Sequence, residues 1–285
     1  MKSYHLQNDF LNVEINSLGA EIKKLFSKKW NKELLWQGDA SVWPRTAPVL
    51  FPIVGKLKDN EFHIHGKTYQ MGQHGFARDM EFECTRELPN ELEFTLRANQ
   101  ETFKNYPFCF ILKISYKIRN ELLFINYEVI NDDRQDIYFS IGAHPGFNTP
   151  NLNDYKILFE KNEEYFYRLN NGLVDWQNPF LLLSDKIQLT KELFNSDALI
   201  FKNLKSSYID LFDPNTRECI RMHHNYASYF GIWGKGDCPF ICLEPWKGVG
   251  DTTTHDKNFL KKEGLNTLPK GEVFQFSYVI ELIKM

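Results

Sequence analysis

Apolar residues recur at every second position through much of the chain, and this alternation constrains the fold more than any other feature of the sequence. The segment "ELEFTLR" (91–97) alternates strictly between apolar and polar side chains. A longer example runs from Phe108 to Ile118, is followed by the turn-forming "RNE", and resumes from Leu123 to Val129. A period of two is typical of a β-strand with one buried face. These segments therefore predict a strand followed by a β-hairpin.

The rest of the chain continues this pattern. The segment "VFQFSYVIELI" (273–283) predicts one more long strand, and turn-forming segments such as "NDDRQD" and "DPNTRE" separate the apolar runs. Helical periodicity is hard to find, and no repeat, low-complexity tract or linker-like stretch interrupts the pattern. We expect the 285 residues to form a single all-β domain, 1–285, in which two large antiparallel sheets pack face to face.

The charge balance and the distribution of apolar residues exclude several classes of protein. A net charge of -3, with 25% charged residues, gives no electrostatic reason to bind a polyanion, so a nucleic-acid partner is not expected. The N-terminal segment lacks the continuous apolar centre of a signal peptide, and no stretch approaches the length of a membrane span. We therefore expect a cytoplasmic protein with no membrane partner.

Cysteine usage indicates reduced thiols. The five cysteines are an odd number at irregular spacing, which suits neither a disulfide framework nor a paired zinc ribbon. Cys242 lies in the apolar run "FICL" and is separated from Cys238 by three residues. Burial as a small apolar side chain is the favoured interpretation of Cys242, ahead of metal binding.

One histidine follows an apolar run within a short segment rich in glycine and proline. In "GAHPGFN", His144 comes directly after the predicted strand "DIYFSI", and the neighbouring glycines and proline restrict the backbone around it. Such a ring should be well aimed. The spacing leaves two interpretations open, a residue that transfers a proton and a turn whose imidazole fills a polar niche.

A carboxylate also follows an apolar run. Glu244 in "FICLEP" precedes a proline, which favours an extended backbone, so we expect it to project from the end of a strand. An acid beside so much apolar surface must be paired, shifted in pKa or functional. A buried ion pair with a core arginine is as compatible with the sequence as a functional role.

Other polar residues stand out less clearly. The segments "WPRTAPVLFPIVGK" and "QHGFARD" place Arg45, His74 and Arg78 among aromatic residues and prolines, where a structural or solvated arginine is the default. His63 and His65 could supply two metal ligands, but no convincing third ligand lies near them in the sequence. The glycine spacings of nucleotide-binding loops are absent from the sequence. We therefore expect neither a metal nor another cofactor.

Several of these segments together resemble one known family. The segments "INSLGAEIKKL", "LFPIVGK", "QHGFARD", "GAHPGFN" and "FICLEPWKGVGD" are similar to those of the aldose 1-epimerase (galactose mutarotase-like) family, most closely its LacX-like and hexose-6-phosphate mutarotase branches. The resemblance extends from about the first predicted strand to the last. It implies a β-supersandwich with a sugar cleft across one sheet. It also implies interconversion of the α and β anomers of an aldose or aldose 6-phosphate.

The resemblance further implies the roles of particular residues. His144 matches the general acid of the family and Glu244 its general base. The positions that match the lining of the sugar or phosphate site are Arg45, Gln73, His74, Arg78 and Asp197. Core packing is the default role for three tryptophans that could instead face a pyranose ring, Trp36, Trp233 and Trp246.

Mutarotation needs residue types of this kind. The anomeric hydroxyl loses a proton while the ring oxygen gains one, the ring opens, and closure presents the other face of the aldehyde. A carboxylate can accept the first proton, and an imidazolium with an ordinary pKa of about 6.5 can donate the second. Such a reaction requires no metal or redox cofactor. The expected partner is a small sugar or sugar phosphate, bound by a monomer.

Two other functions remain open at this stage. A carbohydrate-binding or regulatory protein could use the same sandwich and cleft without turnover. A glycoside hydrolase could use Glu244 and Asp251 as its carboxylate pair, provided that the fold places the two acids about 5–9.5 Å apart across the scissile bond.

Overall fold

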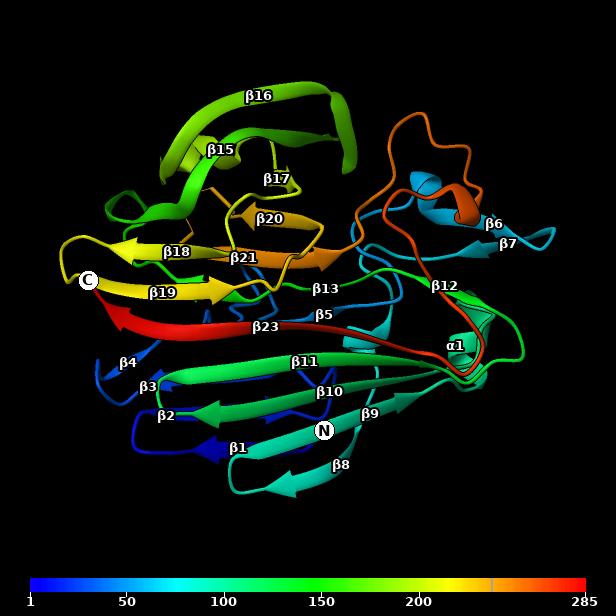
Figure 1. Cartoon of the computed structure of the whole chain (residues 1–285), viewed down its shortest axis with the longest axis horizontal. Helices are drawn as coiled ribbons and strands as arrows, with labels where there is room; N and C mark the ends of the chain where they lie inside the picture. The colour runs from blue at the N-terminus through cyan, green and yellow to red at the C-terminus, as the bar shows by residue number, and fades with distance from the viewer. Residues whose placement is uncertain (237) are drawn as a thin grey trace.

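The computed structural model describes residues 1–236 and 238–285, and most of the described elements are strands (Figure 1). Every pairing between named strands is antiparallel. The large sheet has the spatial order β5 (Val49–Leu50), β13 (Ile141–Ala143), β21 (Phe240–Lys247), β20 (Tyr229–Trp233), β17 (Leu199–Lys202), β15 (Lys156–Asn170), β18 (Tyr208–Asp213), β19 (Glu218–His223), β23 (Val273–Lys284), β11 (Leu122–Asn131), β10 (Phe110–Arg119), β9 (Glu91–Arg97) and β8 (Glu83–Leu88). Two further strands extend it, β14 (Gly146–Asn148) beside β21 and β16 (Leu173–Gln188) beside β15.

Smaller sheets complete the fold. The second layer contains β1 (Ser3–Gln7), β2 (Leu11–Asn16), β3 (Ile22–Ser27) and β4 (Lys32–Glu33). Two-stranded sheets form between β6 (Glu61–Ile64) and β7 (Lys67–Gln70), and between β12 (Ile137–Phe139) and β22 (Asn266–Leu268). The expected all-β antiparallel supersandwich is confirmed, whereas the extent of the domain over residues 1–285 stays a prediction.

The predicted hairpin forms as the alternation indicates. In β10 and β11, Arg119 pairs with Leu122, and Asn120 at the turn has a φ of 53°. The apolar residues from Phe108 to Ile118 and from Leu123 to Val129 that share the predicted face are all buried. A strand with one buried face thus supplies one wall of the core, because its side chains alternate between the core and the surface.

The second layer packs against the large sheet over β9 and β10. The ring of Tyr4 in β1 meets that of Phe94 in β9 edge-on, with centroids 5.2 Å apart. Across the same interface, the hydroxyl of Tyr116 donates a hydrogen bond to the carbonyl of Ala20 at 2.7 Å. The two layers differ in size, because the second layer is much smaller than the large sheet. Alternation does not predict this difference, since it indicates which face of a strand is buried and not which strands pair.

The expectation of little helix overlooks one short element. Helix α1 (Gln100–Asn105) begins at Asn99, whose side chain accepts hydrogen bonds from the backbone N–H groups of Glu101 and Thr102. The side chain of Thr102 in turn accepts from the backbone N–H of Asn99, which completes a capping box. Local capping thus forms a helix of about one and a half turns, although the segment has no helical period of apolar residues.

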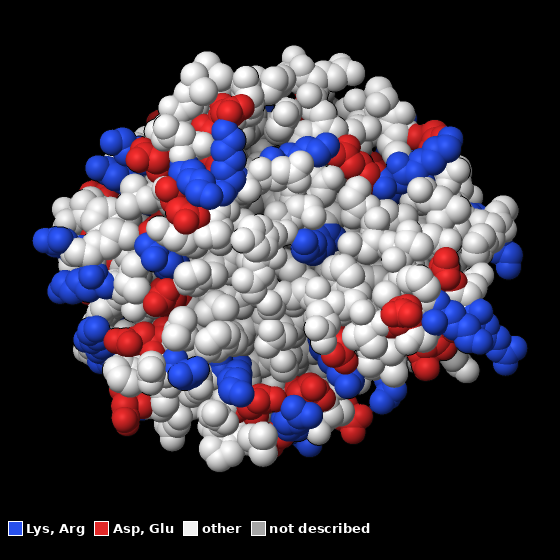
Figure 2. Space-filling model, in the orientation of Figure 1, with Lys and Arg blue, Asp and Glu red and all other residues white. Residues whose placement is uncertain are grey.

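The β15–β16 hairpin covers one part of the large sheet, and the surface charges are mixed. Figure 1 shows the hairpin of β15 and β16 arching over the part of the large sheet that carries β17, β20 and β21. On the face shown in Figure 2, acidic and basic side chains are interspersed, with no extended patch of one sign. None of the described helices is long and apolar enough to span a membrane.

Candidate active site

A cavity of about 610 Å³ lies where β20, β21 and the β13–β14 segment meet loops from the N-terminal third of the chain. The end of the β15–β16 hairpin forms part of its wall through Leu169, Gly172 and Val174. The side chains expected at a sugar site that line this cavity are Gln73, His74, Arg78, His144, Asp197 and Glu244. The fold therefore brings together residues that are up to 171 positions apart in the sequence, from 73 to 244.

His144 is held between two short strands. β13 ends at Ala143 and β14 begins at Gly146, and both strands pair with β21. Gly142 and Gly146 lie in these strands and not in a turn. A Cβ on Gly142 would lie 2.5 Å from the ring of Trp246, and one on Gly146 would lie 2.9 Å from the ring of Trp43. These positions thus require glycine because tryptophan rings pack directly on the backbone around His144.

Aromatic rings fix the orientation of the His144 imidazole. The ring of Trp43 stacks on it, with centroids 4.9 Å apart and an interplanar angle of 30°. The rings of Trp233 and His74 meet it edge-on at 5.6 Å and 5.5 Å. Trp43 was not predicted from the sequence, although it lies two residues before Arg45 in the segment "WPRTAPVLFPIVGK". Stacking covers a face of the imidazole and leaves its nitrogen-bearing edge toward Glu244.

Glu244 lies within strand β21 and not at its end, which corrects the expectation from the following proline. It is paired with Gly231 of β20 and is 1% exposed. On the edge of β21 that faces β13 and β14, the backbone N–H of Leu243 donates to the carbonyl of Pro145. The next residue whose amide would face that edge is Pro245, which has no N–H. The ladder between β21 and β13–β14 is interrupted there, and the interruption gives His144 access to Glu244.

His144 and Glu244 form a close buried pair. His144 Nε2 lies 3.3 Å from Glu244 Oε1. The other polar atom of each side chain, His144 Nδ1 and Glu244 Oε2, is buried without a hydrogen-bond partner among the described residues. Buried polar atoms are normally satisfied, so two open atoms at one cavity indicate a place for a ligand.

Burial moves the pKa values of this pair in opposite directions. Desolvation raises the pKa of Glu244 well above 4.5, and the nearby carboxylate of Asp197 raises it further. Desolvation also lowers the pKa of His144 to about 3, and the positive charges of Arg78 and Arg45 act in the same direction. Both shifts favour the uncharged form of each side chain, a neutral imidazole beside a protonated carboxyl group.

His74 is a buried, neutral neighbour of the pair. Its Nδ1 accepts a hydrogen bond from the backbone N–H of Gly55 at 3.1 Å, so a neutral ring carries its proton on Nε2. The side-chain amide of Gln73 lies 3.2 Å from Nε2 and can accept that proton's hydrogen bond only through its oxygen. Desolvation lowers the pKa of His74 well below 6.5, helped by the proximity of His144 and Arg78. A neutral imidazole in this position can hydrogen-bond to a sugar hydroxyl group.

The two arginines lie at one side of the cavity. Arg78, in the short 3₁₀ helix Ala77–Asp79, donates from Nη2 to the carbonyl of Gln73 at 2.7 Å, and its buried Nε has no hydrogen-bond partner among the described residues. Arg45 does not line the cavity itself and forms an ion pair with Asp79 at 2.7 Å. The guanidinium of Arg78 therefore keeps donor capacity for a ligand.

Asp197 also lines the cavity. Its backbone has a φ of 65°, its Oδ1 accepts from the backbone N–H of Ala198 at 2.9 Å, and its carbonyl accepts from Nη1 of Arg168 at 3.0 Å. Trp233 and Trp246 line the cavity as well, while Trp36 packs with Phe240 outside it. Two of the three tryptophans considered from the sequence thus reach the site.

Asp251, the second acid of a possible hydrolase pair, does not line the cavity. Its Oδ1 accepts from Nζ of Lys262 at 2.9 Å, and its Oδ2 accepts from the backbone N–H of Lys58 at 3.0 Å. Both ionised partners are almost completely buried. Because these bonds occupy the carboxylate, the hydrolase interpretation loses its second acid.

The other histidines considered as metal ligands lie apart from this site. The side chain of His63 is half exposed in β6, and His65 follows the end of that strand. His223 forms an ion pair with Glu281 at 2.7 Å, whereas His224 is buried against the carbonyl of Ser206 at 2.8 Å.

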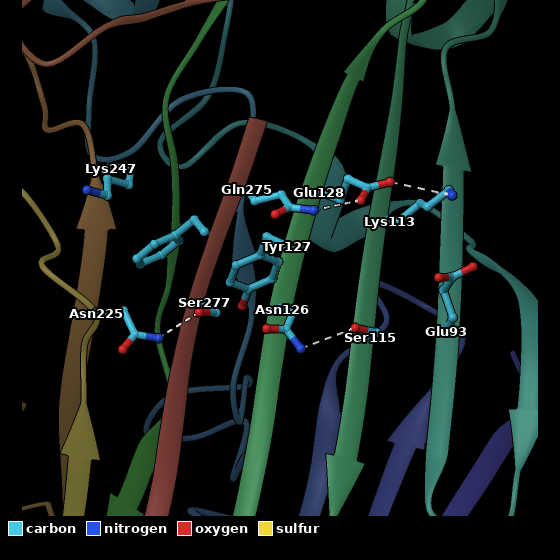
Figure 3. Close-up of a pocket in the computed structure, with 11 residues that line it drawn as sticks. Glu93, Lys113, Ser115, Asn126, Tyr127, Glu128, Asn225, Lys247, Gln275 and Ser277 are labelled. Carbon is cyan, nitrogen blue, oxygen red and sulfur yellow. Dashed lines mark hydrogen bonds and ion pairs between the residues drawn. The ribbon is translucent and has the colours of Figure 1, made fainter. Parts of the chain in front are cut away.

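A second cavity, of about 440 Å³, lies over the face of β9, β10, β11 and β23 (Figure 3). Its polar side chains pair with one another. Gln275 Nε2 donates to Glu128 Oε2 at 3.3 Å, and Asn225 Nδ2 donates to Ser277 Oγ at 2.6 Å. No imidazole is among the described residues that line it. This surface therefore lacks the buried, unsatisfied groups of the first cavity.

Comparison with known proteins identifies a family model, a curated relative and a solved structure that are similar to this chain. The family model of aldose 1-epimerase matches residues 2–280. The chromosomal protein LacX of Lactococcus lactis subsp. lactis is 30% identical over 274 residues, covering 90% of this chain and 91% of LacX. The solved structure of a galactose mutarotase related enzyme from Lactobacillus acidophilus is 34% identical, with a TM-score of 0.96 over 99% of this chain and 98% of that one.

A galactose mutarotase-like protein from Lactobacillus casei ATCC 334 is also similar, with 30% identity and a TM-score of 0.92 over 99% of this chain and 100% of that one. These matches extend over nearly the whole chain and support a mutarotase-like isomerase activity on a small sugar. The chain belongs to the aldose 1-epimerase family and has the galactose mutarotase-like fold.

Proposed function

We propose that the protein interconverts the α and β anomers of an aldose or aldose 6-phosphate, and that His144 and Glu244 exchange the protons. The observation that carries this proposal is the buried pair, separated by 3.3 Å, with an unsatisfied atom on each side chain at an open cavity. A purely carbohydrate-binding site needs hydrogen-bond donors and aromatic rings, and it gains nothing from an acid and a base whose pKa values are shifted in opposite directions.

The single exchangeable proton suits a reversible ring opening. When a sugar separates the pair, a proton must reach the ring oxygen and another must leave the anomeric hydroxyl group. The family resemblance gives the first task to His144 and the second to Glu244, which requires the proton to reside on the imidazole as the sugar binds. Positioned acid–base groups of this kind contribute about 10²–10⁴-fold each to a rate.

The polar groups around the pair would hold the sugar. His74, Gln73 and Asp197 provide hydrogen-bonding groups in the lining of the cavity. Arg78, with Arg45 beside it, could bind either ring hydroxyl groups or a phosphate, because a guanidinium offers a fork of donors. All of these groups come from one chain, and the monomer expected from the sequence stays a prediction.

The test is anomer exchange measured by saturation-transfer NMR over a panel of aldoses and their 6-phosphates. We expect catalysis of at least one member, and a loss of most of that rate in His144→Asn and in Glu244→Gln. His223 and Glu281 provide a matched histidine–glutamate pair outside the cavity, so His223→Asn and Glu281→Gln should retain the rate. Sugar binding without exchange would identify a binding protein instead.

The phosphate question has its own comparison within the same panel. If Arg78 binds a phosphate, Arg78→Lys should raise KM for the preferred 6-phosphate by about tenfold, because a bidentate contact is lost. The KM for the corresponding free aldose should change much less. Equal effects on both sugars would indicate that Arg78 binds a ring hydroxyl group and not a phosphate.

A further inference from the structure

A thiol lies directly behind the acid–base pair. Cys242 precedes Glu244 by two residues in β21, and residues i and i+2 of a strand share a face. Its side chain is fully buried against Trp36 and Phe240. The sulfur of Cys242, a carboxylate oxygen of Glu244 and a ring nitrogen of His144 all lie within 4.8 Å of one another.

These three groups are the common protein ligands of zinc. Zinc binds thiolate sulfur at about 2.3 Å and imidazole nitrogen or carboxylate oxygen at about 2.0–2.2 Å, in tetrahedral geometry, so neighbouring ligand atoms lie about 3.3–3.8 Å apart. The His144–Glu244 contact is already 3.3 Å. Movements of about 1 Å would bring the sulfur to the same spacing.

A second observation points to a ligand at this position. His144 is 8% exposed and Glu244 is 1% exposed, and each carries a buried polar atom that has no hydrogen-bond partner among the described residues. Both side chains line the cavity. An ion held by these two side chains and the thiol would therefore lie beside the cavity.

We propose that Cys242, His144 and Glu244 bind a divalent ion of the zinc class, with the fourth coordination position facing the cavity. Binding releases the thiol proton and the single exchangeable proton of the His144–Glu244 pair to solvent, and no electrons are transferred. The bound ion occupies both proton-transfer groups and thereby inhibits the enzyme. The binding site stands independently of the proposed function, whereas the inhibition rests on it.

The sequence favours burial of Cys242 as a small apolar side chain ahead of metal binding, and the proposal departs from that interpretation. The sequence places the thiol in an apolar run, but only the strand register and the interruption beside Pro245 bring His144 to the same spot. Cys219 offers a useful contrast, because it is equally buried in β19 and lies in no such ligand group among the described residues.

The direct test uses cobalt(II) as a spectroscopic probe with the full chain in metal-free buffer. We expect a near-ultraviolet thiolate-to-cobalt charge-transfer band that saturates at one ion per chain and is removed by Zn²⁺. Cys242→Ser should abolish the band and weaken zinc affinity at least about tenfold. Cys219→Ser should retain both. The absence of the band in the wild-type protein, or its survival in Cys242→Ser, would overturn the proposal.

A second measurement separates the metal site from the proposed reaction. If the protein catalyses anomer exchange, Zn²⁺ should inhibit it, a chelator should restore it, and Cys242→Ser should keep its basal rate while tolerating at least about tenfold more Zn²⁺. If no sugar is turned over, the cobalt titration still decides the metal site. Should Cys242→Ser fail to fold, the cobalt titration of Glu244→Gln tests the binding site alone, since this variant keeps the thiol and removes the carboxylate ligand. It should bind cobalt at least about tenfold more weakly, and an unchanged affinity would overturn the proposal.

Discussion

Glu244 and Asp251 are two buried carboxyl groups seven residues apart in one motif, and their surroundings differ sharply. Asp251 accepts hydrogen bonds from the buried ammonium of Lys262 and from the backbone N–H of Lys58. Glu244 Oε1 lies 3.3 Å from the imidazole of His144, and its Oε2 has no hydrogen-bond partner among the described residues. The chain satisfies one acid internally and leaves the other to be completed by a ligand.

This difference separates structure from function within a single motif. Burying a charge is costly unless it is paired, so the pair of Asp251 and Lys262 is required once the loop that carries it is buried. At Glu244 the same desolvation raises the pKa of the carboxyl group and so favours its uncharged form, which costs less to bury than a carboxylate. Burial alone is therefore a weak sign of catalysis, whereas burial without satisfaction is a strong one.

The largest expected effect is on the rate of Glu244→Gln. The amide keeps the shape of the side chain but can neither gain nor lose the proton, so kcat should fall by about 10²–10⁴-fold. The free energy of unfolding should change by less than about 1 kcal/mol, because no hydrogen bond to Oε2 is lost. NMR exchange rates and urea unfolding measure the two quantities. A large loss of stability with little change in rate would reverse the comparison.

Asp251→Asn should show the opposite pattern. The substitution leaves the ammonium of Lys262 buried without its counter-ion, and removing one partner of a buried pair destabilises a protein by about 3–5 kcal/mol. The folded fraction should still turn over substrate, since Asp251 does not line the cavity. The exposed pair of Asp256 and Lys261 is the control, and Asp256→Asn should leave the urea midpoint almost unchanged.

A smaller effect is expected at the backbone beside His144. A Cβ at Gly142 would lie 2.5 Å from Cδ1 of Trp246, so Gly142→Ala should destabilise the protein by about 1–3 kcal/mol and also lower kcat by displacing His144. Gly72 has open space around it and an unstrained φ, so Gly72→Ala serves as the matched control. A loss of stability with a normal kcat would show that the substitution strains the strand without displacing His144.

The sequence predicts the strands better than their partners. Alternation located the buried face of β10, β11 and most of β23, because a strand records its environment residue by residue. It carries no information on pairing, so the unequal layers and the position of Glu244 inside β21 had to come from the structure. Helix α1 was missed because its signal is a cap and not a period.

The candidate site was predicted largely through family resemblance. The local sequence around His144 and around Glu244 left a functional and a structural role equally open for each, and only the fold brings the two side chains within 3.3 Å. The stacking of Trp43 and the thiol of Cys242 behind the pair depend on long-range register. Such contacts leave no local pattern in a single sequence.

The smallest effect, and the most direct test of how Glu244 differs from a satisfied acid, is the pH dependence of kcat/KM. The pKa of His144 is lowered to about 3, chiefly by desolvation and then by Arg78, so the pair accepts a second proton only near that pH. The pKa of Glu244 is raised well above 4.5, chiefly by desolvation and then by Asp197, so the pair keeps its last proton far above the ordinary range of a carboxyl group. The one-proton state, which the proposed reaction requires, lies between these two shifted pKa values.

After subtraction of the unaided reaction, kcat/KM should change by less than about twofold between about pH 5 and pH 7, with losses only at the two extremes. A freely titrating imidazole with an ordinary pKa of about 6.5 would change it by about fourfold or more over this interval. Arg78→Gln removes a positive charge that disfavours the imidazolium, so the acid limb should move toward neutral pH. His223→Asn, at the surface pair, should leave the profile unchanged. An inflection near pH 6.5 in the wild-type enzyme would show that His144 titrates alone, and the pair would then not share a proton.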